Sequence, residues 1–238
     1  MRDDKKAVLT AVVILLSRRN LTAQRIAPPQ YREKPPFDLK AAFGTTGNWK
    51  ATVNAAMEPA PDFDSDEGAS QSRICFVRTA PQASDCAYFR DLFHSKLTFQ
   101  TLSSLTVEQL RSGSSPVSGL VMKADALYPT GQIHETAIWV YSPRQDRFHL
   151  AAAVESNEVR IFTIGPLNGF LITADWHRDE EETRWSDHRR DITVYRFSGD
   201  NGDASFGKVL EYTTTKKYGA EYTGAIEAEQ ANIEAKIP

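Results

Sequence analysis

The sequence has no apolar run long enough to span a bilayer, and it has no excess of basic residues. The apolar stretch from Ala7 to Ser17 is shorter than the about 20 residues that a membrane-spanning helix needs. The 28 Lys and Arg residues are outnumbered by 31 Asp and Glu residues, whereas nucleic-acid binding requires a basic surface. We therefore expect neither an integral membrane protein in the mature form nor a nucleic-acid-binding protein.

The common sequence signatures of catalysis are also missing. The chain has no G-x-S-x-G elbow, no glycine-rich phosphate loop and no cysteine in a catalytic setting. The usual hydrolase, nucleotide-binding and thiol mechanisms therefore lack their starting residues. This absence favours a protein that is not an enzyme.

Residues 1–23 have the pattern of a secretory signal peptide. Basic residues precede the apolar stretch, and Ala23 offers a small residue at which a peptidase can cut. Two aspartates near the start and two arginines after the apolar stretch depart from the pattern, so a short membrane-proximal anchor or a buried N-terminal helix stays open. A cleaved signal predicts a periplasmic or secreted protein whose net charge is −6.

The remaining chain divides into a spacer and one folded body. Residues 24–36 contain two Pro-Pro pairs and few apolar residues, which predicts a proline-rich linker. The whole chain is 41% hydrophobic and 25% charged, as in ordinary globular proteins. Residues 37–238 are long enough to bury one core, and we predict a single β-rich domain there.

The folded body carries the pattern of an antiparallel β protein. Runs of β-branched, aromatic and alternating residues recur from residue 73 to residue 215, with turn residues between them. We predict a mainly β fold, a meander of about ten strands that forms two packed sheets or a squat barrel. Isoleucines at helical spacing predict a short C-terminal helix over residues 223–236.

An eight-residue pattern, His-x-x-x-Ile-x-Val-Tyr, occurs twice, beginning at His134 and at His188. Each copy is followed by a polar turn and a second apolar run, so the repeat predicts a duplicated β-hairpin, in a unit of the length of a propeller blade. Too few strands follow the second copy for a true propeller. Because side chains alternate along a strand, the Ile and Val positions share one face, which we expect in the core.

Cys75 and Cys86 flank a strand pattern and a turn rich in Pro, Ser and Asp. The two sulfur atoms can therefore face each other across a hairpin. In an exported protein this spacing predicts a disulfide, which would stabilise the fold by roughly 2 to 3 kcal/mol. A metal or redox pair is disfavoured because no histidine flanks either cysteine.

The densest group of potential ligands lies in residues 175–191, between two predicted strands. Closure as a long hairpin would bring together two histidines and two carboxylates, a set that can bind zinc or a similar ion or act as a base and its orienting group. The competing interpretation is a solvated hairpin tip, because no tight H-x-x-x-H or H-x-H pair is present. The candidate ligands are Asp175, His177, Asp187 and His188.

Aromatic residues offer a second candidate surface. On neighbouring strands they could form an exposed stacking platform for a sugar or a peptide. If the C-terminal helix or residues 24–60 cover this face, the same aromatics form a second small core. The residues of this candidate binding surface are Trp139, Tyr141, Trp176, Trp185 and Tyr195.

Together these features favour an exported, non-enzymatic β-domain that binds a partner or associates with the cell envelope, through a glycan or a protein and without a cofactor. The alternative is a metal-binding protein or metal-assisted hydrolase that uses residues 175–191 and a divalent metal. A purely structural envelope component is the third possibility.

Overall fold

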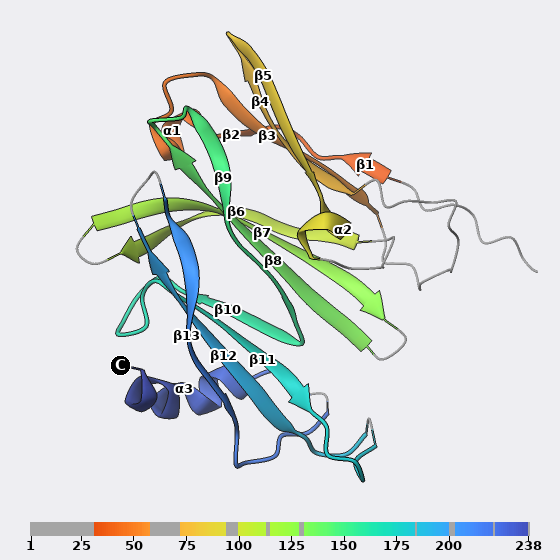
Figure 1. Cartoon of the computed structure of the whole chain (residues 1–238). Coiled ribbons are helices and arrows are strands. Elements are labelled where there is room, and N and C mark those ends of the chain that lie inside the picture. The colour runs from red at the N-terminus through yellow and green to blue at the C-terminus, as the bar shows by residue number, and fades with distance from the viewer. Residues whose placement is uncertain are drawn as a thin grey trace, which may run out of the picture.

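The computed structural model describes residues 31–57, 72–93, 100–112, 115–128, 131–183, 185–199, 203–220 and 222–237. Within these residues the chain is mainly β, with two sheets and three helices (Figure 1), which confirms the predicted fold class. None of the helices in the described ranges is long and apolar enough to cross a membrane. The predicted signal peptide, residues 1–23, lies outside the described residues.

The larger sheet, sheet A, contains nine strands in the order β5-β4-β3-β6-β7-β8-β9, with β1 and β2 also paired to β3. Sheet B contains four strands in the order β10-β11-β12-β13. The strands of sheet A are β1 (Tyr31–Glu33), β2 (Phe37–Asp38), β3 (Trp49–Ala56), β4 (Arg73–Thr79), β5 (Gln82–Tyr88), β6 (Gln100–Ser112), β7 (Ser115–Tyr128), β8 (Gly131–Ser142) and β9 (Arg147–Ser156). Those of sheet B are β10 (Glu158–Phe162), β11 (Phe170–His177), β12 (Arg189–Ser198) and β13 (Ser205–Thr213), and the helices are α1 (Lys40–Phe43), α2 (Phe89–Leu92) and α3 (Ala225–Lys236).

Within the described ranges almost every strand pair is antiparallel, as the turn pattern predicts. The exception is the contact between β3 and β6, which run parallel where Ala56 pairs with Thr101. This contact joins the β5-β4-β3 part of sheet A to the β6 to β9 meander, and the resulting sheet is curled (Figure 1). The folded body also begins before Phe37, since Tyr31–Glu33 of the expected linker pairs with β3.

The duplicated pattern corresponds to two hairpins in different sheets. The first copy forms β8 and continues into β9, and the second forms β12 and continues into β13. Ile138 and Val140 are completely buried, and so are Ile192 and Val194, which confirms the expectation that this face of each copy lies in the core. In the first copy the opposite face is buried as well, because the curl of sheet A encloses it.

Three apolar clusters hold the layers together, and a strand buried on both faces belongs to two of them. The first fills the inside of the curled sheet A and contains Trp49, Phe76, Leu120, Trp139 and Phe148. The second lies between the two sheets and contains Leu110, Val121, Ile138, Leu171 and Phe197. The third lies between sheet B and α3 and contains Phe170, Ile172, Ile192, Val194, Ile226 and Ile233.

The helix α3 is fixed to sheet B at its N-terminal end by a carboxylate from a strand. Glu158, the first residue of β10, accepts hydrogen bonds from the backbone N–H groups of Ala225 (3.0 Å) and Ile226 (3.2 Å). These N–H groups have no partner inside the helix, and the helix dipole favours a negative charge there. Ile226 and Ile233 then pack fully buried against the sheet.

The disulfide predicted between Cys75 and Cys86 is present. The two residues are directly opposite each other in the antiparallel pair β4 and β5, and their Cα atoms are 4.1 Å apart. The strand β5 is the edge of sheet A. The cross-link therefore ties an edge strand to its single neighbour in the sheet.

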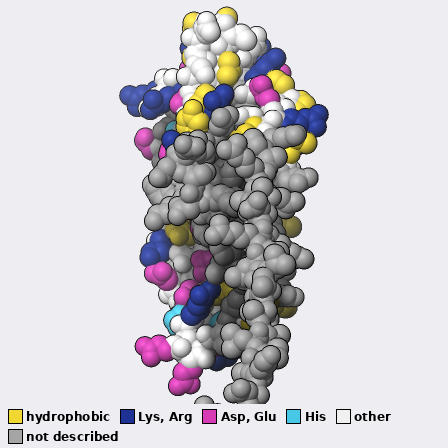
Figure 2. All heavy atoms as spheres, turned by 90° about the vertical axis from the view of Figure 1, so that its right-hand side faces the viewer, with side chains coloured by type: hydrophobic (Ala, Val, Ile, Leu, Met, Phe, Trp, Pro, Cys, Tyr) yellow, Lys and Arg dark blue, Asp and Glu magenta, His cyan; other side chains and the backbone are white. Residues whose placement is uncertain are grey.

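On the face shown in Figure 2, acidic and basic side chains stand next to each other among the residues drawn in colour. This mixture fits the small net charge of −3 for the whole chain.

Candidate functional site

The segment from 175 to 191 does form a hairpin, but its register separates the predicted ligands. β11 pairs with β12 so that Asp175 is opposite Asp191 and His177 is opposite Arg189. Directly opposite residues of an antiparallel pair lie on the same face of the sheet, and their chain neighbours lie on the other. His177 and His188 therefore lie on opposite faces of sheet B.

His177 is bound to a carboxylate on its own face. Its Nδ1 atom lies 3.0 Å from both oxygens of Asp191, and its Nε2 atom lies 3.6 Å from Asp179. Thr213 donates a further hydrogen bond of 2.6 Å to Asp191. The arrangement orients the imidazole ring, and it occupies the carboxylate that would otherwise be available to a metal ion.

Asp175 stabilises the passage of the chain from sheet A to sheet B. Only Asn157 separates β9 from β10, and the Asp175 carboxylate accepts hydrogen bonds from the Asn157 N–H (3.0 Å) and the Ser156 hydroxyl (2.9 Å). Burial raises the pKa of this carboxyl, although both hydrogen bonds oppose the shift. Its role in the structure is to hold a crossover.

His188 belongs to a buried cluster on the other face. Its side chain is completely buried, its Nδ1 atom lies 2.8 Å from Glu182, and its ring stacks on Trp176 with centroids 5.4 Å apart. Lys217 also donates to Glu182, and these two contacts lower the pKa of the Glu182 carboxyl to about 2. The buried Arg190 lies over the same indole and donates to the backbone oxygens of residues 219 and 222. The cluster fixes the segment before α3 onto sheet B.

The predicted set of metal ligands does not assemble. His177 and His188 are each bound to a different carboxylate, Asp175 is bound at the crossover, and Asp187 lies beside Gly219. Within the described residues no group of three or more His, Cys, Asp or Glu side chains could hold a metal ion. The expectation that these four side chains converge is wrong. It depended on the register between β11 and β12, and the number of residues that connect the two strands does not determine this register.

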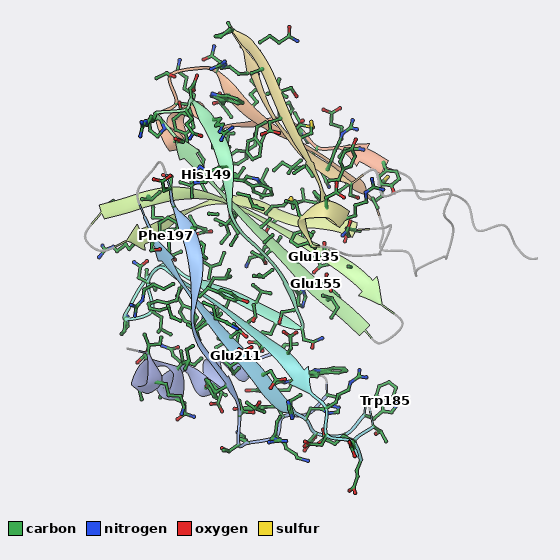
Figure 3. The ribbon with its side chains drawn as sticks, viewed as in Figure 1. Glu135, His149, Glu155, Trp185, Phe197 and Glu211 are labelled. Carbon is green, nitrogen blue, oxygen red and sulfur yellow. A yellow bond between two sulfur atoms is a disulfide. The ribbon has the colours of Figure 1, made fainter. Side chains whose placement is uncertain are left out.

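The five candidate aromatic residues do not share one exposed face either. Trp139 and Tyr141 are each 3% exposed and lie inside sheet A, where Phe76 and Phe148 pack against them. Trp176 is stacked on His188, Tyr195 is half-buried beside the cluster between the sheets, and Trp185 is 68% exposed. Figure 3 shows Trp185 at the far tip of sheet B from Phe197, a residue of the cluster between the sheets. The covered alternative is the one that the structure adopts for Trp139 and Tyr141. Residues of the 24–60 segment, among them Leu39 and Trp49, lie in the same core cluster together with residues of β4 and β9, and no described residue of the C-terminal helix belongs to it.

Tyr141 has a specific polar contact at the end of this inner core. Its hydroxyl donates a 2.6 Å hydrogen bond to Asp146, in the turn between β8 and β9. The indole N–H of Trp49 also donates to Asp146 (3.0 Å), and Arg78 forms an ion pair with it. The hydrogen bond from Tyr141 is the largest of the effects that lower the pKa of the Asp146 carboxyl. These contacts make Tyr141 a structural residue.

A cavity of about 430 Å³ lies where one end of sheet B meets the end of β6 and the C-terminal end of α3. No candidate from the sequence lies in it. It is lined by Arg111, Gly165, Pro166, Leu167, Asn168, Phe170, Arg196, Phe197, Glu234 and Ile237.

The turn that forms one wall of the cavity is held by a glycine. Gly169 has φ of +87°, and a Cβ atom added there would lie 2.3 Å from the carbonyl oxygen of Arg111. Its N–H donates to Phe162, and its oxygen accepts a hydrogen bond from the N–H of Phe197. Only glycine combines this backbone conformation with so close an approach. The turn is thereby fixed against both sheets.

The lining of the cavity contains both apolar and charged residues. Leu167 and Phe170 are buried in the cluster between sheet B and α3, whereas Phe197 is buried in the cluster between the two sheets. The guanidinium of Arg196 lies 5.0 Å from the centre of the Phe170 ring. The Oδ1 atom of Asn168 is buried and has no hydrogen-bond partner within the described residues.

Sequence reasoning missed this site because its residues come from four distant segments. Around Asn168 the sequence shows only a turn signal. The sequence around Arg111 or Arg196 does not indicate which other segments lie next to these strand residues. The one local indication was the turn itself, in which glycines at positions 165 and 169 bracket a Pro-Leu-Asn tripeptide.

Comparison of the chain with protein-family models, curated proteins and solved structures gave no match.

Proposed function

We propose that the protein is an exported, non-enzymatic β-domain that acts by binding, and that its ligand occupies the cavity between β6, the 165–170 turn, β12 and α3. The observation that carries this proposal is the composition of the cavity walls. Small-molecule sites are concave, mostly apolar and furnished with a few polar groups that set orientation. A volume of about 430 Å³ matches the size of such a site, and Asn168 and two arginines supply polar groups beside the apolar side chains of Leu167, Phe170 and Ile237; the lining is mixed rather than mostly apolar.

Two further features support export and binding. The Cys75–Cys86 disulfide supports an extracellular or periplasmic location, since such cross-links persist mainly in oxidising compartments. Three of the four candidate ligands, Asp175, His177 and His188, are engaged in structural hydrogen bonds, which favours binding over metal-assisted hydrolysis. An aromatic glycan platform has less support than the cavity, because Trp139 and Tyr141 are buried.

Equilibrium dialysis with 8-anilinonaphthalene-1-sulfonate tests the proposal, since this probe combines an apolar body with a polar group. The wild-type protein should bind about one molecule of the probe per chain. Ile237→Trp should weaken binding at least tenfold, because the indole would fill the cavity next to α3. Leu150→Trp is the matched control, since Leu150 is 43% exposed on β9 and is not part of the lining.

Thermal unfolding of both variants, followed by circular dichroism, verifies that they are folded. Absence of binding by the wild-type protein, or equal binding by the two variants, would refute the cavity as the ligand site.

A further inference from the structure

Glu135 lies beside the joint between the two parts of sheet A. At this joint the β5-β4-β3 part meets the β6 to β9 meander, and Ala56 with Thr101 is the one position at which β3 and β6 pair in the described ranges. Gln100, the residue before Thr101, donates a 2.8 Å hydrogen bond from its Nε2 group to Glu135 on β8. Gln100 and Glu135 are completely buried. A buried polar contact therefore links the start of β6 to β8 next to the joint.

Hydrogen bonds continue from Gln100 to the other side of the joint. The Oγ atom of Ser72, the residue before β4, donates a 3.1 Å hydrogen bond to the backbone oxygen of Gln100. The backbone oxygen of Ser72 accepts a 3.0 Å hydrogen bond from the N–H of Phe89, the first residue of α2. Phe89 is completely buried in the apolar cluster inside sheet A. A change at Glu135 can therefore reach segments on both sides of the joint.

The carboxyl group of Glu135 is placed among negative charges. Glu155 is directly opposite it on β9, and the two side chains lie side by side (Figure 3). Asp125 on β7 acts from the other face of the sheet, because it is opposite His134, the chain neighbour of Glu135, and the two form a 2.7 Å contact. The Oε2 atom of Glu135 is buried and has no hydrogen-bond partner within the described residues. One oxygen of a carboxylate at this position would lack any stabilising contact.

The other elements near Glu135 bring no compensating cation. Its neighbour on β7 is Ala124, and the contacts from β6 and from the residue before β4 are uncharged. On α2, Arg90 and Asp91 are exposed and lie 3.4 Å from each other. None of the ion pairs in the described part of the chain includes Glu135.

These surroundings suit the neutral acid and oppose the carboxylate. A buried charge without a partner is costly, and the cost disappears when the group reaches water. Burial, with the charges of Glu155 and Asp125 as further causes, raises the pKa of Glu135 to about 8, although the hydrogen bond from Gln100 opposes the shift. Ionisation therefore favours any form of the protein in which Glu135 is hydrated.

We propose that Glu135 is a pH-dependent switch on the joint of sheet A: the neutral acid keeps the joint closed, and the carboxylate favours a form in which the joint opens while sheet B stays folded. The opening is local, because the other end of the inner core gains nothing from ionisation. There Trp49 and Phe76 pack on Phe148, with ring centroids 5.9 and 4.8 Å apart. The switch is independent of the proposed ligand cavity.

Amide hydrogen exchange of the ¹⁵N-labelled full chain from pH 5 to pH 8.5, corrected for the intrinsic pH dependence of exchange, tests this proposal. In the wild type the protection of the Phe89 amide, which donates to Ser72 beside the joint, should fall at least tenfold, since each pKa unit between the closed and the open form changes the opening equilibrium tenfold. The Leu39 amide, which donates to Trp49 at the other end of the inner core, and the Ile172 amide of β11 should keep their protection within about twofold.

Two variants assign the effect to Glu135. Glu135→Gln should abolish the fall at Phe89, because the amide keeps an oxygen for Gln100 and cannot ionise. Glu211→Gln is the matched control and should behave as the wild type, since Glu211 is exposed on β13 and pairs with Lys208. The comparison of amides within the wild type stands even if Glu135→Gln does not fold.

Three results would overturn the proposal. Equal loss of protection at Phe89, Leu39 and Ile172 would mean that the whole molecule opens rather than the joint. A fall at Phe89 that persists in a folded Glu135→Gln variant would exclude Glu135 as the switch. Constant protection of Phe89 in the wild type across the pH range would exclude a pH-dependent opening of the joint.

Discussion

Glu135 is the buried group whose replacement should change the stability of this protein most visibly. It lies on β8 inside sheet A and is completely buried. The Nε2 group of Gln100 donates a 2.8 Å hydrogen bond to one carboxyl oxygen, and the other oxygen has no partner in the described residues. Glu155 is directly opposite on β9, and Figure 3 shows the two side by side. Burial, together with the charges of Glu155 and Asp125, raises the pKa of Glu135 to about 8.

The sign and size of the effect follow from this pKa. The folded protein binds the Glu135 proton more tightly than the unfolded chain, whose carboxyl titrates near its ordinary value of 4.5. The stabilising effect is therefore fully present below pH 4.5 and is lost as the pH rises to about 8. At 1.36 kcal/mol per pKa unit, the loss amounts to about 3 kcal/mol at pH 7 and about 5 kcal/mol above pH 8.

Glu135→Gln should remove this dependence. The amide keeps the oxygen that accepts from Gln100, and its NH₂ group replaces the protonated oxygen, so the neutral side chains are closely matched. Near pH 4.5 the variant and the wild type should have similar free energies of unfolding. At pH 8 the variant should be more stable by several kcal/mol.

Urea unfolding followed by circular dichroism, at intervals from pH 4.5 to pH 9, measures the difference. Glu211→Gln is the control, since Glu211 is an exposed residue of β13 paired with Lys208 on the surface (Figure 3), and such pairs are worth at most about 1 kcal/mol. If the free energy of unfolding falls by the same amount in the wild type and in Glu135→Gln between pH 4.5 and pH 9, Glu135 is not the source of the pH dependence.

Two further substitutions test the disulfide and the cavity wall. Replacing both Cys75 and Cys86 by serine should lower the free energy of unfolding in urea by about 2 to 3 kcal/mol, because the cross-link restricts the unfolded chain; an unchanged urea midpoint would contradict this. Gly169→Ala should cost about 1 to 3 kcal/mol in the same assay and weaken binding of 8-anilinonaphthalene-1-sulfonate, because the new Cβ collides with the carbonyl of Arg111. Gly165→Ala is its control: φ is also positive (+74°), but nothing lies within 4 Å of the added atom, so equal losses would count against the collision.

The strands could be predicted because their signals are local. Alternation of side chains and the turns between runs indicated β10 and β11 within a residue or two of their bounds, and isoleucine spacing indicated α3. The division into two sheets is not local. The chain passes from sheet A to sheet B through Asn157 alone. Two residues of β11 fix this passage: the Asp175 carboxylate accepts from the Asn157 N–H, and the Trp176 N–H donates to the Asn157 side chain.

The candidate site was harder to predict, for two physical reasons. A change of one residue in register moves every side chain of a strand to the other face, and the eleven residues between His177 and Arg189 carry no turn signal that sets the register. Curvature is also invisible in a strand pattern. The face with Trp139 and Tyr141 resembled a surface of aromatics, whereas the curl of sheet A turns it into the inner core.

A chemical-shift map of the ¹⁵N-labelled protein during titration with 8-anilinonaphthalene-1-sulfonate tests the central claim most directly. The largest changes should fall on the amides of residues that line the cavity, Arg111, Leu167, Asn168, Arg196 and Glu234, with little change around Trp185. Changes centred on residues 175–191, or no saturable change at all, would contradict a ligand cavity between sheet B, β6 and α3.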